Sequence, residues 1–288
     1  MRTVGQALVA GLKARGVEVV FGIPGVHTIE MYRGLAGGGI RHVTPRHEQG
    51  AAFMADGYAR VSGKPGVAFV ITGPGLTNAL TAMGQAKADS VPMLVISGVN
   101  RRASLGKGLG LLHELPDQAA MVRALCPTER LEDPAELEAV LDRAFAHMAT
   151  GRPGPVHIEV PVDVMPMACP EGARGAVPVR PAADAADIDR AVALLDAARR
   201  VVILAGGGAR GCDAALTALA ERLDAPVVLT VNARGMLHGH ALGVPASPSL
   251  DAVRDVIRGA DQVLALGTEL GPTDYDMYVR GGLPDLSG

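Results

Sequence analysis

Short apolar runs alternate with amphipathic stretches along most of the chain. Each run is about four to eight residues long, rich in Val and Ile and bounded by Gly or Pro, which is typical of a buried strand. In the first half, we expect strands at 17–23, 39–45, 66–73, 92–98 and 155–161, and helices at 3–15, 27–35, 47–60, 75–88 and 134–148. Regular alternation of strand and helix indicates an α/β fold, in which a doubly wound parallel sheet is covered by helices on both faces.

The alternation is interrupted at 161–187, where prolines, glycines and small residues are typical of a linker. It resumes with helices expected at 186–198, 211–223 and 250–258, and strands at 200–206, 226–231 and 262–267. We therefore predict a first domain over 1–165, a linker over 166–185 and a second, Rossmann-like α/β domain over 186–288. A doubly wound domain usually has more than three strands, so we expect this second domain to be truncated.

Composition narrows the class of protein. The net charge is −3 and 20% of the 288 residues are charged, which is typical of a soluble globular protein and gives no reason to expect a nucleic-acid or membrane partner. Neither a signal peptide nor an apolar run of membrane-spanning length is found. Cys126, Cys169 and Cys212 are too widely spaced for a zinc pattern, and we interpret them as reduced thiols of a cytoplasmic protein.

Three loops carry the candidate chemistry, and each follows a predicted strand. They are "FGIPGVH" (21–27), "TPRHEQG" (44–50) and "TGPGLTN" (72–78). In open α/β sheets, ligands bind beyond the carboxyl ends of the strands, where such loops lie. The glycines Gly73 and Gly75 would let a flat ligand approach the backbone.

Two side chains of these loops have alternative interpretations. Glu48 opens the alanine-rich helix of "HVTPRHEQGAAFMADGYAR" (42–60), where a carboxylate is also favoured by the helix dipole alone. Two further Gly-rich loops at the same sheet edge favour a functional role, because nothing structural requires all three. His27 is either a histidine of the helix start or core, or a functional residue.

A fourth motif points to a different class of enzyme. Gly206, Gly208 and Gly211 of "AGGGARG" have the GxGxxG spacing of dinucleotide-binding proteins. The next strand ends in "LTVNARG", without the acidic residue that binds ribose in such proteins. The hypothesis of a nicotinamide-dependent oxidoreductase therefore depends on these glycines alone. We interpret them as a turn that allows a phosphate or backbone to approach.

Four segments together resemble the pyrimidine-binding domain of thiamine-diphosphate enzymes. They are "FGIPG", "RHEQGAAFMADGYAR", "TGPGLTNALTA" and "GRPGPVHIEVPVD" (151–163). The segments occur in the family's order and are spread over about 160 residues. The resemblance is to the family of acetolactate synthases, benzaldehyde lyases and 2-oxoacid decarboxylases. Within it, the segments are most similar to decarboxylases that act on 5-guanidino-2-oxopentanoate. The second half resembles the start of the family's central domain.

The resemblance implies a role for each matching residue. Glu48 matches the glutamate that hydrogen-bonds N1′ of the aminopyrimidine and favours the imino tautomer, whose nitrogen takes the C2 proton of the thiazolium. The resulting ylid attacks a 2-oxo acid, CO2 leaves, and the cofactor holds the carbanion. A carboxyl group hidden from water suits this proton exchange. His27 and Gln118 match residues near the substrate and the reactive carbon. Positions that match the pyrimidine lining are Pro24, Gly25, Thr72, Gly73, Gly75 and Asn78.

The family's motif for Mg2+ and the diphosphate does not occur here. That motif is GDG followed by Asn, whereas "ADG" at 55–57 places Asp56 inside the Glu48 helix. The resemblance thus implies that Mg2+ and the diphosphate bind a domain outside this chain, that no metal ligand lies within it, and that the fragment alone is inactive. Since the family's site forms between subunits, a homodimer or homotetramer is expected.

Two further points separate the members of the family. Acetolactate synthases hold a non-redox FAD in the central domain, but "TVNARGMLHGHALGVP" (230–245) differs from their usual sequence. This difference argues against FAD and favours a simple decarboxylase or carboligase. The alternatives are an acetolactate synthase-type carboligase and a non-catalytic subunit that supplies only half of a site to a partner chain.

Overall fold

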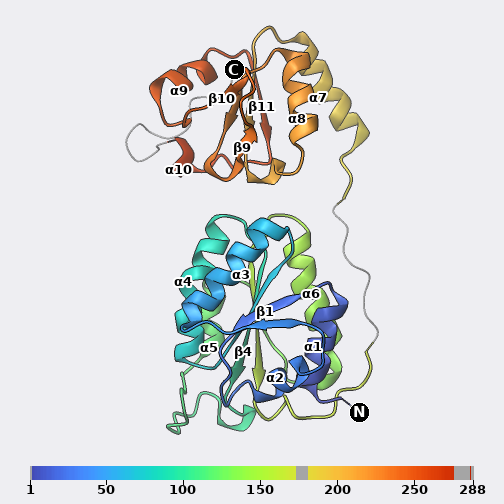
Figure 1. Ribbon diagram of the computed structural model, residues 1–288, viewed down its shortest axis with the longest axis vertical. Coiled ribbons are helices and arrows are strands. Elements are labelled where there is room, and N and C mark those ends of the chain that lie inside the picture. The colour runs from blue at the N-terminus through green and yellow to red at the C-terminus, as the bar shows by residue number, and fades with distance from the viewer. Residues whose placement is uncertain (1, 173–180, 276–285, 287–288) are drawn as a thin grey trace. The chain divides into compact units, whose positions relative to one another are not determined.

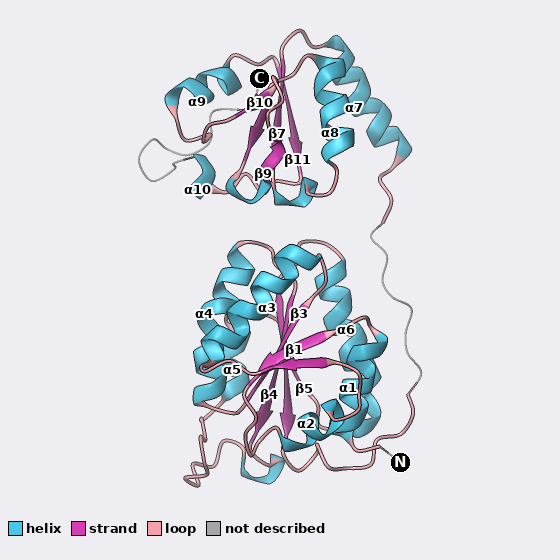
Figure 2. Cartoon of the chain, viewed as in Figure 1, coloured by secondary structure: helices cyan, strands magenta, loops and turns pink. Residues whose placement is uncertain are grey.

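The computed structural model describes residues 2–172, 181–275 and 286. It contains two compact units, Met1–Pro181 and Ala182–Gly288, and each is an α/β structure (Figures 1 and 2). The first unit includes residues beyond the predicted boundary at 165, since the Cys169 N–H donates to Arg2 O and the Val4 N–H donates to Met167 O. The middle of the predicted linker, 173–180, lies outside the described residues.

The first unit is built on a six-stranded parallel sheet. Its order is β2-β1-β3-β4-β6-β5, so the chain runs from β1 outward to β2 and then returns to the other side of β1. The predicted doubly wound topology is confirmed, and the direction reverses between β1 and β3, where such folds bind ligands. The strands are β1 (Val19–Gly22), β2 (Arg41–Val43), β3 (Gly66–Val70), β4 (Met93–Val99), β5 (Thr128–Arg130) and β6 (Pro155–Pro161).

Helices cover both faces of this sheet because successive strand residues point to opposite sides. Phe69 packs with α1, α2 and α6, whereas Ala68 and Val70 pack with α3, α4 and α5. The helices are α1 (Val4–Ala14), α2 (Ile29–Leu35), α3 (Glu48–Ser62), α4 (Pro74–Ala88), α5 (Gln118–Arg123) and α6 (Leu137–Ala149), with short 3₁₀ turns η1 (Arg102–Ser104) and η2 (Pro134–Glu136). Neither β5 nor α5 was predicted from the sequence.

The alanines of α3 serve close packing on the sheet. Ala51, Ala52 and Ala55 are fully buried, and a Cβ on Gly66 of β3 would lie 1.9 Å from Ala55 O. Only small side chains allow a helix to approach a strand this closely. The alanine run therefore fixes the position of α3, and with it the position of Glu48 at its start.

The second unit contains a four-stranded parallel sheet of order β10-β8-β7-β11. The expectation of only three strands was wrong, because β10 is two residues long and leaves no pattern in the sequence. The strands of the sheet are β7 (Val201–Ala205), β8 (Val227–Leu229), β10 (Gly243–Val244) and β11 (Gln262–Leu266), and a further strand, β9 (Arg234–Leu237), is not among these four. The helices are α7 (Ala185–Ala197), α8 (Asp213–Leu223), α9 (Asp251–Arg258) and α10 (Pro272–Tyr275), with 3₁₀ turns η3 (Gly207–Ala209) and η4 (Val231–Ala233).

The glycine turn after β7 contacts backbone. The Gly208 N–H donates to Gly267 O at 2.8 Å, and the Gly206 N–H donates to Leu266 O. A Cβ on Gly208 would lie 2.9 Å from Gly267 Cα. The glycines thus let two chain segments meet. The Gly208 N–H is already bonded to Gly267 O, so it is not directed at a phosphate. No helix within the described ranges is both long and apolar enough to cross a membrane.

Candidate functional site

The candidate site lies at the carboxyl ends of β1, β2 and β3, beside the point where the strand order reverses. The loops that follow these strands are the three predicted from the sequence. A fourth loop, at 105–117, follows β4 and η1 and had not been predicted to contribute. Neighbouring parallel strands end at the same edge of a sheet, so four separate segments converge there.

Glu48 and Asn78 meet across two of these loops. Glu48 is the first residue of α3, and the N-cap residue His47 accepts from the Gln49 N–H through Nδ1. Asn78 lies in the first turns of α4, and its Nδ2 donates to Glu48 Oε2 at 2.9 Å. Among the described residues, no hydrogen bond to the other oxygen, Oε1, is found. The predicted convergence is therefore present, with one carboxylate oxygen held and the other available.

Glu48 is half-buried. Within this chain the carboxylate is therefore only partly hidden from water, and the dry environment expected in the assembled site stays a prediction. The reason for the partial burial is its position, because the first residue of α3 lies at the rim of the sheet, one turn before the buried alanines begin.

The site glycines make room for protein neighbours. A Cβ on Gly25 would lie 2.5 Å from Ile71 Cγ2, and a Cβ on Gly75 would lie 2.6 Å from Ile71 Cγ1. Ile71 therefore packs against both Gly25 and Gly75, and the neighbouring Pro24 of the loop after β1 is exposed. The approach of a ligand to Gly75 stays a prediction, and packing of Ile71 is a further reason for glycine at this position. Ile71 had no signal in the sequence beyond its position at a strand end.

His27 is paired with a second histidine. His27 is 6% exposed, and its ring centroid lies 6.1 Å from that of His113 in an edge-to-face arrangement. Its buried Nδ1 has no hydrogen-bond partner among the described residues. Burial lowers the pKa of His27, and the nearby His113 lowers it further. His113 was missed from the sequence, where it follows the glycine-rich stretch "GKGLG" of the 105–117 loop.

Gln118 and Thr72 lie inside the protein. Gln118 is 2% exposed and Thr72 is 1% exposed, and the Thr72 hydroxyl donates to Gln118 Oε1 at 2.7 Å. The Gln118 amide is bonded to chain atoms on both its oxygen and its nitrogen. This placement favours a supporting role for Gln118 over contact with a substrate.

The acidic residues of the 105–117 loop stabilise the loop itself. Glu114 accepts from the N–H groups of Leu109 and Leu111, and these backbone contacts lower the pKa of its carboxyl group. Asp117 caps α5 by accepting from the Ala120 N–H at 2.8 Å. Glu114 is therefore held by backbone amides through both oxygens, and Asp117 through Oδ1.

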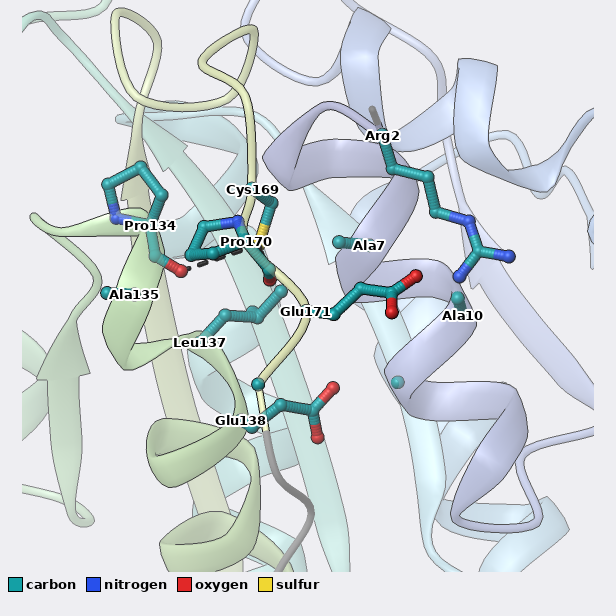
Figure 3. A pocket seen from close by; sticks show the side chains of 12 residues that line it. Arg2, Ala7, Ala10, Pro134, Ala135, Leu137, Glu138, Cys169, Pro170 and Glu171 are labelled. Carbon is teal, nitrogen blue, oxygen red and sulfur yellow. Dashed lines mark hydrogen bonds between the residues drawn. The ribbon is translucent and has the colours of Figure 1, made fainter.

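A cavity of about 540 Å³ lies elsewhere in the first unit, between α1, the start of α6 and residues 169–172 (Figure 3). Its walls include small residues such as Ala7 and Ala10, and the Cys169 thiol beside it donates to Pro134 O. No predicted site residue lines it. Within the described part of the chain, no group of three or more His, Cys, Asp or Glu side chains is arranged to hold a metal ion.

Comparison with known proteins decides the family. Residues 2–121 match the family model of the N-terminal thiamine pyrophosphate-binding domain, and residues 188–281 match that of the central domain of the same enzymes. The chain belongs to the thiamine pyrophosphate enzymes. The predicted family and fold class are confirmed.

Two groups of relatives are found. The chain is 53% identical, over 95% of its length, to the probable 2-ketoarginine decarboxylase AruI of Pseudomonas aeruginosa. It is 33% identical, over 91% of its length, to the acetolactate synthase isozyme 1 large subunit of Escherichia coli, and 34% identical over 91% to the isozyme 3 large subunit. These alignments cover 50%, 48% and 48% of the relatives. The chain thus spans about half the length of the curated relatives it matches.

Proposed function

We propose that this chain is part of a thiamine-diphosphate-dependent decarboxylase of 5-guanidino-2-oxopentanoate, the compound also called 2-ketoarginine. The observation that carries the proposal is the 53% identity to the probable 2-ketoarginine decarboxylase, against 33% and 34% for two acetolactate synthases. All three identities are measured over more than nine-tenths of the chain.

The residues of the site fit the pyrimidine half of the cofactor. Thiamine diphosphate, when bound, supplies a carbon nucleophile and an electron sink for decarboxylation. Glu48 Oε1 is the oxygen free to exchange a proton with N1′ of the pyrimidine, while Asn78 holds Oε2 in place. Ile71 gives the site an apolar wall between the two glycine loops. The paired rings of His27 and His113 stand at the same edge of the sheet, next to the loop that precedes Asn78.

Recognition of the guanidinium group requires a further partner. Glu114 and Asp117 are the carboxylates of the nearest loop, and both accept hydrogen bonds from their own backbone. We therefore propose that a substrate-binding carboxylate comes from another part of the complete enzyme, which would also hold Mg2+ and the diphosphate. Pairing of two subunits as a homodimer or homotetramer would bring the two half-sites together, and FAD has no part in this proposal.

The test is CO2 release by the protein as its own cells make it, supplied with thiamine diphosphate and Mg2+. We expect release from 5-guanidino-2-oxopentanoate to exceed release from pyruvate at equal concentration. Glu48→Gln keeps the shape of the side chain but removes its acid, so release should fall by at least about a hundredfold. Glu18→Gln is the matched control, because Glu18 is a carboxylate of the same unit paired with Lys64 and remote from the site.

The alternatives give different results in the same assay. Acetolactate formation from pyruvate, with no preference for the guanidino substrate, would identify a carboligase. An intact mass equal to that of this chain, with activity only after a second chain is added, would identify a half-site subunit. Full activity of Glu48→Gln would refute the assignment of Glu48 in any of these enzymes.

A further inference from the structure

A group of buried polar side chains lies next to the site loops, on β4 and β6, just after β3 and at the start of α5. Each is at most 2% exposed, although polar groups are seldom fully buried without a structural reason. Strand register brings them together, because Ser97 of β4 and Arg130 of β5 both stand opposite Glu159 of β6. The members are Thr72, Ser97, Gln118, His157 and Glu159.

Gln118 is the centre of this group. Its Oε1 accepts from the Gly73 N–H at 3.0 Å and from the Thr72 hydroxyl at 2.7 Å. Its Nε2 donates to Gly98 O at 2.9 Å and lies 3.1 Å from both Ser97 Oγ and Glu159 Oε2. One amide therefore joins the loop after β3 to the end of β4.

The two glycines held by Gln118 contact the two histidines of the site. A Cβ on Gly73 would lie 2.4 Å from His113 O, and a Cβ on Gly98 would lie 2.7 Å from His27 Cβ. Gly73 also has φ +61° and ψ −115°, a conformation open to glycine and strained for other residues. The positions of Gly73 and Gly98 thus determine where His113 and His27 can stand.

Glu159 acts together with Gly98 O and the Gly73 N–H in setting which way the Gln118 amide faces. A carboxylate attracts the NH2 group and repels the carbonyl oxygen, so Nε2 faces Glu159 and Oε1 faces the Gly73 N–H. In the opposite orientation, two N–H donors would face each other at Gly73 and two oxygen acceptors would face each other at Glu159. Glu159 is fully buried, and the Arg130 Nε donates to its second oxygen, which neutralises the charge.

We propose that Glu159 is a positioning residue, which acts through Gln118 to hold Gly73 and Gly98 where they bring His27 and His113 together. It touches neither the cofactor nor the substrate. The catalytic consequence rests on the proposed function, whereas the geometric part concerns this chain alone. A buried ion pair that only stabilised the fold would lower the stability of the whole unit without a specific effect at Gly73.

Amide hydrogen exchange of the chain, read residue by residue by NMR without cofactor, separates these two roles. The Gly73 N–H should be protected in the unmodified chain, because Gln118 Oε1 is its acceptor. In Glu159→Gln the exchange at Gly73 should be about tenfold faster, and in Gln118→Met it should approach the rate of an unprotected amide. Glu138→Gln is the matched control, because it removes one carboxylate from the buried Arg15 without contacting the network.

Unchanged Gly73 exchange in a folded Glu159→Gln chain, relative to Glu138→Gln, would overturn the proposal. A measurement on the unmodified chain decides the case in which the Glu159 variant does not fold. There, the Nε2 protons of Gln118 should exchange far more slowly than those of exposed Gln85, and equal rates would equally overturn it.

The catalytic consequence is measured on the complete enzyme. In Glu159→Gln, the thiamine diphosphate concentration needed for half-maximal activity should rise about tenfold, while Glu138→Gln should leave it unchanged. Faster Gly73 exchange in an enzyme that releases no CO2 from any 2-oxo acid would mean that the proposed function fails and the positioning role stands. Unchanged Gly73 exchange in Glu159→Gln, with an enzyme that does release CO2, would mean that the positioning role fails and the proposed function stands.

Discussion

His157 connects the stability of the first unit to pH, and the structure gives both the direction and the size of the effect. The side chain is fully buried, and burial lowers its pKa from 6.5 to about 3, with a further contribution from the nearby Arg123 charge. Its Nε2 lies 2.8 Å from Ser97 Oγ. These two atoms share one hydrogen bond, and protonation of the ring would place a positive charge in the buried interior.

The sign follows from which state binds the proton. Below about pH 6.5 the unfolded chain protonates His157, whereas the folded chain does not until about pH 3. The stability is therefore complete above pH 6.5 and is lost as pH falls toward 3. Each pH unit in this window costs about 1.4 kcal/mol, so lowering the pH from 7.5 to 4.5 should reduce the free energy of unfolding by about 3 kcal/mol.

Two measurements check this value. Exchange of the β4 amides, corrected for the intrinsic effect of pH, gives the free energy of unfolding of the first unit between pH 4.5 and 7.5. His157→Gln removes the titrating group. The free energy of unfolding of this variant should therefore change less steeply with pH, by the equivalent of nearly one bound proton, even though the variant starts from lower stability. The remaining slope includes His27, whose pKa is also lowered. A ¹³C-histidine titration reports the ring directly, and a His157 signal that titrates near pH 6.5 in the folded chain would refute the reasoning.

Three smaller predictions concern single contacts of the first unit. Gly66→Ala should lower its stability by about 1–3 kcal/mol in thermal unfolding, because the new Cβ meets Ala55 O, and an unchanged Tm would contradict that packing. Thr3→Ala removes the capping box that Thr3 forms with Gln6 and should cost about 1 kcal/mol, whereas Thr3→Ser should cost little. Glu114→Ala removes the acceptor of two loop amides, so hydrogen exchange over 108–112 should accelerate while exchange in β4 stays the same.

The sequence was informative where a feature depends on local pattern. The strands that carry the site are apolar runs bounded by Gly and Pro, and the rule that ligands bind at carboxyl ends brought the three loops together correctly. β5 is a three-residue strand, "TER", at the edge of the sheet, and α5 is six residues long. Both are too short to produce a periodic signal, and they exist because neighbouring elements supply their hydrogen bonds and contacts.

The contacts of Gln118 and His113 could not be predicted in the same way. Gln118 bonds to Thr72 and Gly73, which lie 46 and 45 residues away along the chain. Its motif suggested a residue near the substrate, but motif position does not reveal which way a side chain points at the end of a strand. His113 reaches the site from a loop with several positive-φ glycines, and its own φ is +57°. Such loop geometry follows from contacts made after folding, so the paired histidines are visible only in the structure.

The glycines of the site have a structural cause that does not depend on a ligand. A Cβ on Gly25 or Gly75 would collide with Ile71, and a Cβ on Gly73 would collide with the backbone of His113. All three glycines are thus required by contacts within the chain, and on their own they would be consistent with a protein that binds nothing. The feature that favours chemistry is the half-buried carboxylate of Glu48, at the edge where the strand order reverses: Asn78 holds one oxygen, and the other has no hydrogen bond within the described part of the chain. The glycines serve that carboxylate indirectly, because the close packing they allow keeps the loops around it in place.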